Sequence, residues 1–378
     1  MKGKKNHNYR NLAFFYHGSL SNKFSGESVY LSSLISSLKE KFNITVIDGT
    51  TALNSRKNSS KIYLLLLAYL RSLRFYIEEL KKDKEQRAAV FLSEDLYISI
   101  LVVVLAKLSK VKFIYRPSDV GKDYRLELSK MYFLSPFFYF ASYISELVLL
   151  NFSDILISVS PKITDHLKKY GIENKNIINF PFIMTDKMTF DKEKIEEFKA
   201  KYNLFGKIVA IFVGSPNYPP NMEAIRFITE LAKELQPKKE IVFLIAGKGT
   251  DKIDIATPNN LIILGAVDDL DTILYSSQIG LSPSLVPGGL ITKVVNYLVH
   301  GLLVLSTVEG ASGIVENENL FISERNTFAD KLMEICVGLN DNKIQIGNIP
   351  DSVGDIYLNK SYLRVFPDLL YEKITEDI

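Results

Sequence analysis

Short apolar runs alternate with longer amphipathic runs through the first half of the chain. Apolar runs of four or five residues are typical of strands, and the amphipathic runs between them are typical of helices. Strands are expected at residues 12–16, 44–48, 88–92, 112–115 and 154–158. Helices are expected from about residue 27 to 41, over 96–108, and after Ser160-Pro161. This alternation predicts parallel strands joined by right-handed crossovers.

A second alternating series follows a polar, turn-rich stretch at residues 185–191, which is expected to be a linker. Its apolar runs have four to six residues each, the pattern of strands buried on both faces. They lie at residues 208–213, 241–246, 261–264, 279–282 and 303–306. The 378 residues therefore predict two open α/β domains in tandem. Ligands of such sheets bind beyond the carboxyl ends of the strands.

Composition narrows the class of protein. Hydrophobic residues make up 47% and charged residues 24%, as in a globular protein. The net charge of +3 gives no reason to expect nucleic acid as a partner. Cys336 is the one cysteine, which excludes an internal disulfide and indicates a buried thiol in a reducing compartment. The N-terminus shows no signal peptide, so a cytoplasmic protein is expected.

Two segments in the first half are apolar enough to be candidate membrane segments. Arg71 and Arg74 follow the apolar residues 62–70, and Pro136 and Glu146 interrupt residues 131–150. Neither has the roughly 20 apolar residues of a spanning helix. Peripheral association with the inner face of a membrane stays open, because residues 61–82 combine an apolar side with basic residues. The alternative is that both segments face the core, which is favoured for residues 131–150.

A glycine pair before a helix is the strongest indication of chemistry. Gly288 and Gly289 follow an apolar strand, and Thr292 and Lys293 stand at the expected helix start. Glycines let backbone N–H groups approach a ligand, and a helix N-terminus favours an anion. Lys293 adds a full positive charge, so the pattern predicts a diphosphate site. The alternative is a tight turn followed by a solvated lysine.

Several motifs together resemble one family. They are DILISVSPKITDHL at 154–167, IFVGSPNYPPNMEAIRFI at 211–228, FLIAGKGT at 243–250, LIILGAVDDLDTIL at 261–274, and residues 281–307. The chain resembles family 4 of the retaining GT-B glycosyltransferases. The resemblance implies two Rossmann-like domains facing across a cleft, with a C-terminal helix crossing back to the first. The expected parts are an acceptor-side domain at 1–186, a donor domain at 187–353, and the helix within 354–378.

The resemblance also assigns residues to a site. It implies that the donor is held by Ser25, Gly26, Gly214, Gly247, Lys248, Ala266, Val267, Gly288, Gly289, Leu290, Thr292, Lys293 and Asn296. Within this set, Ala266 and Val267 would meet the nucleobase, and Asn296 would meet the ribose. Lys293 would stabilise the leaving diphosphate. Asp119, preceded by Ser118, would face the transferred sugar, although a turn or helix cap also explains it.

Departures from the family pattern bear on activity. The usual glutamate pair falls on Gly288 and Asn296, and a usual histidine falls on Ser118. Arg116 is expected to pair with a carboxylate in preference to a diphosphate. The pair Glu94-Asp95 is expected either to line the site or to cap a helix. His17 is open between an acceptor contact and a structural role.

The function implied is retaining transfer of a sugar from a UDP- or GDP-type donor to a glycan or lipid-linked acceptor. No metal or other cofactor is expected, since no Cys/His cluster has metal spacing. The alternative is a non-catalytic GT-B accessory subunit that has lost the glutamate pair.

Overall fold

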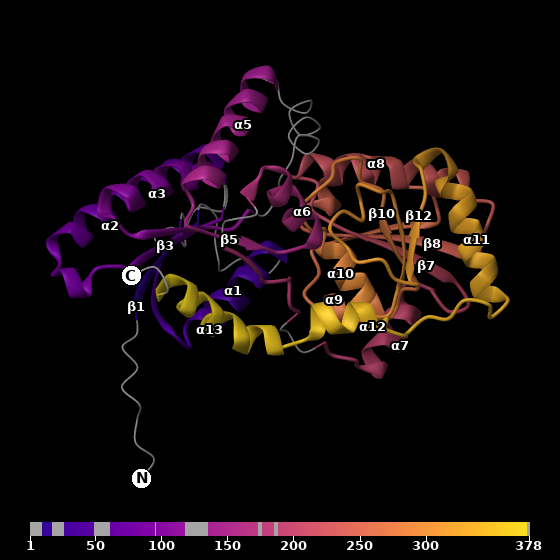
Figure 1. Ribbon diagram of the computed structural model, residues 1–378. Coiled ribbons are helices and arrows are strands. Elements are labelled where there is room, and N and C mark those ends of the chain that lie inside the picture. Colours follow the sequence, from indigo (N-terminus) through magenta and orange to yellow (C-terminus); the bar gives the residue numbers. More distant parts are fainter. Residues whose placement is uncertain are drawn as a thin grey trace, which may run out of the picture. The chain divides into compact units, whose positions relative to one another are not determined.

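A computed structural model describes residues 10–16, 26–48, 61–94, 96–117, 135–172, 176–184 and 188–375 (Figure 1). The chain forms two compact units. Unit 1 contains Met1–Met184 together with Asn359–Ile378, and unit 2 contains Thr185–Leu358. Unit 2 is therefore one continuous segment, whereas unit 1 is built from both ends of the chain.

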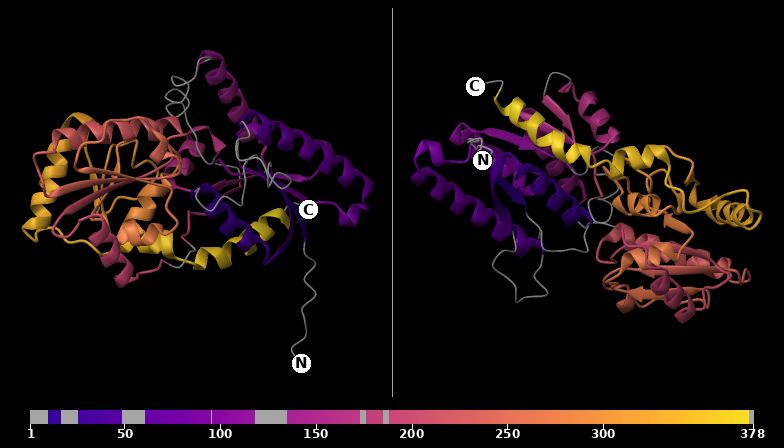
Figure 2. Two further views of the ribbon diagram at one scale, coloured as in Figure 1. Left: turned by 180° about the vertical axis from the view of Figure 1, so that it is seen from behind. Right: turned by 90° about the horizontal axis from the view of Figure 1, so that it is seen from below.

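Unit 1 has a parallel six-stranded sheet in the order β2-β1-β3-β4-β5-β6. Its strands are β1 (Arg10–Tyr16), β2 (Phe42–Asp48), β3 (Val90–Ser93), β4 (Lys112–Tyr115), β5 (Ile155–Ser158) and β6 (Asn176–Asn179). Its helices are α1 (Gly26–Leu38), α2 (Lys61–Lys81), the 3-10 turn η1 (Lys84–Gln86), α3 (Leu96–Ser109), α5 (Ser135–Phe152), α6 (Pro161–Lys169) and α13 (Ser361–Thr375). Helices α1 and α13 cover one face, and α2, α3 and α5 lie side by side on the other (Figures 1 and 2).

The last helix packs on the first unit, as predicted. Ser37 Oγ in α1 donates to the carbonyl oxygen of Leu363 at 2.5 Å. The rings of Phe180 and Phe366 lie 4.2 Å apart, and Phe366 is buried. The helix expected within residues 354–378 does not fill that segment. A π-turn, η5 (Gly354–Leu358), buries Tyr357 in unit 2, and α13 begins after it, where Asn359 Oδ1 accepts from the N–H of Ser361 at 3.1 Å.

Unit 2 has a second parallel sheet in the order β12-β11-β10-β7-β8-β9. Its strands are β7 (Ile208–Val213), β8 (Ile241–Ala246), β9 (Leu261–Gly265), β10 (Ile279–Ser282), β11 (Leu303–Ser306) and β12 (Leu320–Ile322). Its helices are α7 (Lys192–Lys201), α8 (Pro219–Glu234), α9 (Leu270–Tyr275), α10 (Thr292–Val299), α11 (Phe328–Asn340) and α12 (Asp351–Val353), with 3-10 turns η3 (Thr250–Lys252) and η4 (Arg325–Thr327).

The core of unit 2 lies between its sheet and the helices α8 and α11. Ile225 and Ile228 from α8 share one apolar cluster with Phe328 and Leu332 from α11 and with the inward side chains of the strands. Cys336 belongs to this cluster and is buried, as predicted. Helices α9 and α10 cover the opposite face (Figure 1). Among the residues described, no helix combines the length and apolar character needed to cross a membrane.

Candidate functional site

Backbone hydrogen bonds donated by two glycines connect the carboxyl ends of β7, β8 and β9. The N–H of Gly214 donates to the carbonyl oxygen of Ala246 at 2.9 Å, and that of Gly247 donates to Gly265 at 2.7 Å. A Cβ at Gly247 would lie 2.3 Å from the carbonyl oxygen of Gly214, and the φ of Gly247 is +154°. Only glycine fits this approach. Gly214 and Gly247 therefore fix the carboxyl edge of the sheet.

The loop that follows β10, residues 283–291, carries Gly288 and Gly289 and is called the Gly288 loop here. It is held by the turn after β11, residues 307–313. Ser312 Oγ donates to the carbonyl oxygen of Gly288, and the N–H of Ile291 donates to that of Ser312 at 3.2 Å. A Cβ at Gly313, whose φ is +77°, would lie 2.1 Å from the carbonyl oxygen of Gly289. The turn thus sets the backbone path of the predicted diphosphate loop.

Lys293 lies one residue after the start of α10, and its amine points to neighbouring elements. Nζ donates to Asn221 Oδ1 at 2.7 Å and lies 4.1 Å from the centre of the Phe212 ring. Lys293 is half-buried, and desolvation lowers the pKa of its amine to about 7. An anion placed beside the amine would raise that pKa. The start of α10 has no side-chain cap, so its first N–H groups also suit an anion.

The far end of α10 is anchored by His300. Its Nδ1 lies 2.7 Å from the carbonyl oxygen of Asn296, and its Nε2 lies 3.0 Å from Asp271 Oδ1. Asp271 Oδ2 accepts from the N–H of Thr189 at 2.7 Å. This chain of contacts fixes α10 to α9 and to the segment before α7. The side chain of Asn296 is half-buried.

The remaining predicted residues of unit 2 line the same edge. Lys248 is exposed, and its carbonyl oxygen accepts from Ser215 Oγ at 2.9 Å. Ala266 is exposed and Val267 half-buried in the loop after β9, while Leu290 is half-buried in the Gly288 loop. The site residues predicted in unit 2 all follow carboxyl ends of strands, as expected for this kind of sheet.

Most of the candidate residues predicted in unit 1 lie in segments that the structure does not describe. Ser25, Ser118, Asp119, His17 and Asp95 lie outside the described residues, and Gly26 is the first residue of α1.

Arg116 forms a buried ion pair with Glu94, which confirms its expected carboxylate partner. Its guanidinium also lies 4.2 Å from the centre of the Tyr30 ring.

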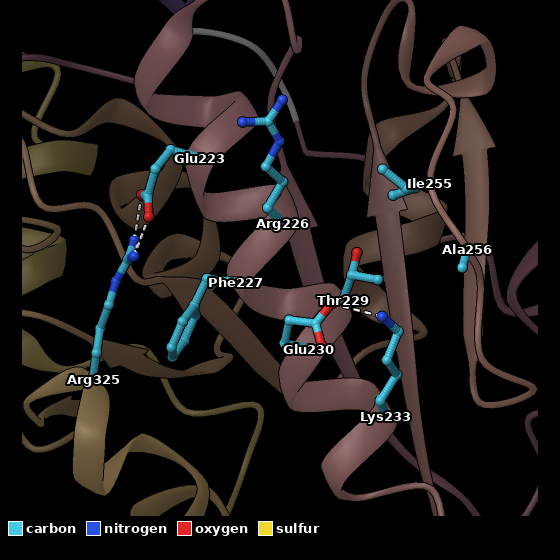
Figure 3. Close-up of a pocket in the computed structure, with 9 residues that line it drawn as sticks. All are labelled: Glu223, Arg226, Phe227, Thr229, Glu230, Lys233, Ile255, Ala256 and Arg325. Atoms are coloured by element: carbon cyan, nitrogen blue, oxygen red, sulfur yellow. Dashed lines mark hydrogen bonds and ion pairs between the residues drawn. The ribbon is translucent and has the colours of Figure 1, made fainter.

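A groove of about 410 Å³ runs along α8 next to residues 255–256 (Figure 3). At one end Arg325 binds Glu223 through both terminal nitrogens and lies 4.5 Å from the Phe227 ring. Its Nε donates to the carbonyl oxygen of Pro283 at 2.9 Å. Arg325 therefore ties α8 and η4 to the start of the Gly288 loop.

Within the described part of the chain, no group of three or more His, Cys, Asp or Glu side chains is placed to hold a metal ion.

Comparison with known proteins identifies the fold. The family described as "Glycosyl transferases group 1" matches residues 207–339. The sucrose-phosphate synthase of Thermosynechococcus elongatus is similar in structure, with a TM-score of 0.71 and 12% identity, over 98% of this chain and 100% of that one.

Two further solved structures are similar in the same way. Anabaena HepE, crystallised with UDP and glucose, has a TM-score of 0.70 and 11% identity over 96% and 100% of the two chains. WaaG, a glycosyltransferase involved in lipopolysaccharide biosynthesis, has a TM-score of 0.60 and 13% identity over 97% and 98%. No curated protein matches in sequence. The chain has the GT-B fold, and the resemblance to group 1 glycosyltransferases is confirmed.

Proposed function

We propose that this GT-B protein, whose second unit carries the group 1 match, is a retaining glycosyltransferase that uses a UDP- or GDP-type sugar donor. The observation that carries the proposal is the position of Lys293. Its half-buried amine stands beside Phe212, after a glycine loop whose backbone is fixed by Ser312. A half-buried amine and an uncapped helix start together suit a diphosphate. HepE, with a similar fold, was crystallised with UDP and glucose.

In the proposed reaction, the bond between the anomeric carbon and the donor phosphate oxygen breaks, and its electron pair leaves with the diphosphate. An acceptor hydroxyl oxygen bonds to the same face of the sugar, and its proton passes to the leaving phosphate. The protein contributes mainly by placing positive charge and N–H groups where negative charge grows. Lys293 and the start of α10 supply these, and Asp119 would orient sugar or acceptor hydroxyls. No metal or cofactor enters this proposal.

The departures at Gly288 and Asn296 define the competing function. Gly288 has no side chain for a sugar hydroxyl, and Asn296 offers the ribose a neutral amide in place of a carboxylate. A chain that kept the fold but lost the ability to bind a sugar donor would be an accessory subunit. Donor binding therefore decides between the two functions.

The deciding experiment measures binding of UDP, GDP, ADP and their sugars by thermal shift and calorimetry. A ligand bound only by the folded protein raises its apparent stability. Lys293→Ala removes a charge-assisted contact worth about 1.5–3 kcal/mol, which is a roughly tenfold to hundredfold loss of affinity. Lys238→Ala, an exposed lysine outside the site, is the matched control and should bind normally.

Asn296 variants extend the same experiment to the ribose. Asn296→Ala should cost only about 0.5–1.5 kcal/mol, because the lost hydrogen bond is neutral. Asn296→Glu restores the usual family residue and should keep or tighten binding. Wild-type affinity in Lys293→Ala would place the phosphates elsewhere. No binding by wild type to any nucleotide tested would favour the accessory subunit.

The proposed acceptor is a glycan or a lipid-linked sugar at the inner face of an anionic membrane. An exposed apolar stripe on α2 supports this location. Its members recur every three or four residues and are 40–56% exposed: Leu66, Leu70, Leu73, Ile77 and Leu80. Arg74 and Lys81 lie on the same helix and are exposed. An apolar stripe flanked by basic residues is typical of helices that lie on a membrane surface.

Flotation with anionic liposomes tests this location. The wild-type protein should float with the liposomes at low salt, and Leu73→Glu/Ile77→Glu should not. The control is Leu369→Glu on α13, which changes an equally exposed leucine on the other face of the unit 1 sheet. Absence of co-flotation by the wild type, or equal loss in the control, would refute the membrane location.

A further inference from the structure

Asn221 is the polar side chain that receives the Lys293 amine. It is the third residue of α8 and lies 72 positions before Lys293 in the chain, and the two meet because α8 and α10 start at the same edge of the sheet. We propose that Asn221 is a positioning residue for Lys293. The neutral amide of Asn221 orients the Lys293 amine without compensating its positive charge, so that charge is available to an anionic ligand. That the ligand is a nucleotide diphosphate rests on the proposed function.

The Asn221 amide is fixed on three sides. Oδ1 accepts from Lys293 Nζ at 2.7 Å, and Nδ2 donates to the carbonyl oxygen of Ser215 at 3.1 Å. Behind the amide, a Cβ at residue 214 would lie 2.8 Å from its Cγ, so Gly214 leaves the space in which it sits. A flipped amide would place its NH₂ against the amine and its oxygen against a carbonyl. Asn221 therefore presents an acceptor to Lys293 in one orientation.

The charged groups of neighbouring elements do not neutralise Lys293. Within the described residues, no ion pair includes Lys293. Glu223, the carboxylate two residues after Asn221 on α8, is bound by Arg325. On α10, the Tyr297 hydroxyl accepts from the N–H of Val213 at 2.8 Å. Lys248, in the loop after β8, is exposed and is itself a cation.

The first turn of α8 offers few N–H donors to an anion, so binding of an anion at this edge depends more on the Lys293 amine. Pro219 and Pro220 occupy its first two positions, and proline has no N–H to offer an anion. Desolvation lowers the pKa of the amine to about 7. An arriving diphosphate would therefore complete the protonation of Lys293 and take up a proton. A carboxylate at position 221 would remove this response, because it would hold the ammonium form before any ligand arrives.

The experiment follows the titration of Lys293 and the binding of UDP in Asn221→Asp. The ε-CH₂ signal of Lys293 is followed by NMR against pH in isotope-labelled protein, with Lys293→Met to assign it. Asn221→Asp should move the titration midpoint upward by roughly one to three pH units, the effect of an opposite charge in contact. UDP affinity should fall roughly tenfold to hundredfold, because the charge is already compensated. Proton uptake on binding, measured by calorimetry in buffers of different ionisation enthalpy, should disappear.

The matched control is Asn217→Asp, which makes the same change at an exposed position just before α8 and should leave all three readouts unchanged. Because an aspartate in contact with the amine shifts the midpoint by its charge alone, Asn221→Ala separates the two roles: a purely structural Asn221 would alter stability in that variant but not the midpoint. An unchanged midpoint in Asn221→Asp overturns the inference. If Asn221→Asp does not fold, Asn221→Ala carries the test: the midpoint should fall, because the hydrogen bond that favours the ammonium is lost. A wild type that binds no nucleotide overturns the proposed function, while the NMR midpoint still decides whether Asn221 controls Lys293.

Discussion

Replacing Lys293 by methionine should change binding and stability in opposite directions. Methionine keeps much of the side-chain volume but removes the amine, whose pKa falls from 10.5 to about 7 in the folded protein. This shift means that holding the ammonium in the folded state costs on the order of 4–5 kcal/mol below pH 7. The lost contacts with Asn221 and Phe212 are worth about 1–2 kcal/mol together. Lys293→Met should therefore be more stable than wild type by about 2–4 kcal/mol at pH 6.

The pH dependence has a definite sign. Between pH 7 and pH 10.5 the unfolded chain keeps the lysine proton while the folded protein has lost it. The unfolded state then binds more protons, so the contribution of Lys293 to stability rises with pH through this window. The advantage of Lys293→Met should accordingly be largest at pH 6 and should shrink or reverse by pH 10.

Urea unfolding at pH 6, 8 and 10 measures the difference, and calorimetry with UDP measures binding by the same two proteins. Binding should fall roughly tenfold or more in Lys293→Met. Lys238→Met is the matched control, because that lysine is exposed and outside the site. A stability difference between Lys293→Met and wild type that does not change from pH 6 to pH 10 would refute the account of the buried amine.

Two further changes test other parts of the structure by urea unfolding. Ser312→Ala leaves the carbonyl oxygen of Gly288 without its Ser312 hydrogen bond and should destabilise by about 1–3 kcal/mol, with weaker UDP binding. The exposed Ser352→Ala should stay within about 0.5 kcal/mol, and equal effects of the two would argue against a role for the turn. Arg116→Met leaves Glu94 buried without its arginine and should cost about 3–5 kcal/mol. Arg226→Met, at an exposed arginine, should cost little, and recovery of stability in Arg116→Met/Glu94→Gln would support the ion-pair explanation.

The fold was largely predictable where strands are buried on both faces. The bounds of β7, β8, β10 and β11 match the predicted apolar runs, since residues inside a parallel sheet have little reason to be polar. The two strands that were missed, β6 and β12, are edge strands. They are short, and β6 has asparagine at both ends, so neither produced a clear apolar run.

The geometry of the candidate site was predictable only in its local part. Gly288, Gly289, Thr292 and Lys293 form one short pattern, and the structure places them together. Asn221 was missed as a partner of Lys293 because the contact joins residues 72 positions apart, and no local pattern reports such a pairing. The turn at residues 307–313 did leave a signal. Gly310 and Gly313 follow the buried strand β11, just as Gly288 and Gly289 follow the buried strand β10.

The split composition of unit 1 has a consequence for synthesis on the ribosome. Phe366, Leu370 and Ile374 of α13 are buried in unit 1, although they follow all of unit 2 in the chain. Unit 1 therefore cannot complete its core until the ribosome has read through all of unit 2. At about 5–20 residues per second, that delay is roughly 10–40 s. Unit 2 is continuous and can fold as soon as it emerges, so the second unit in the sequence is the first able to finish folding.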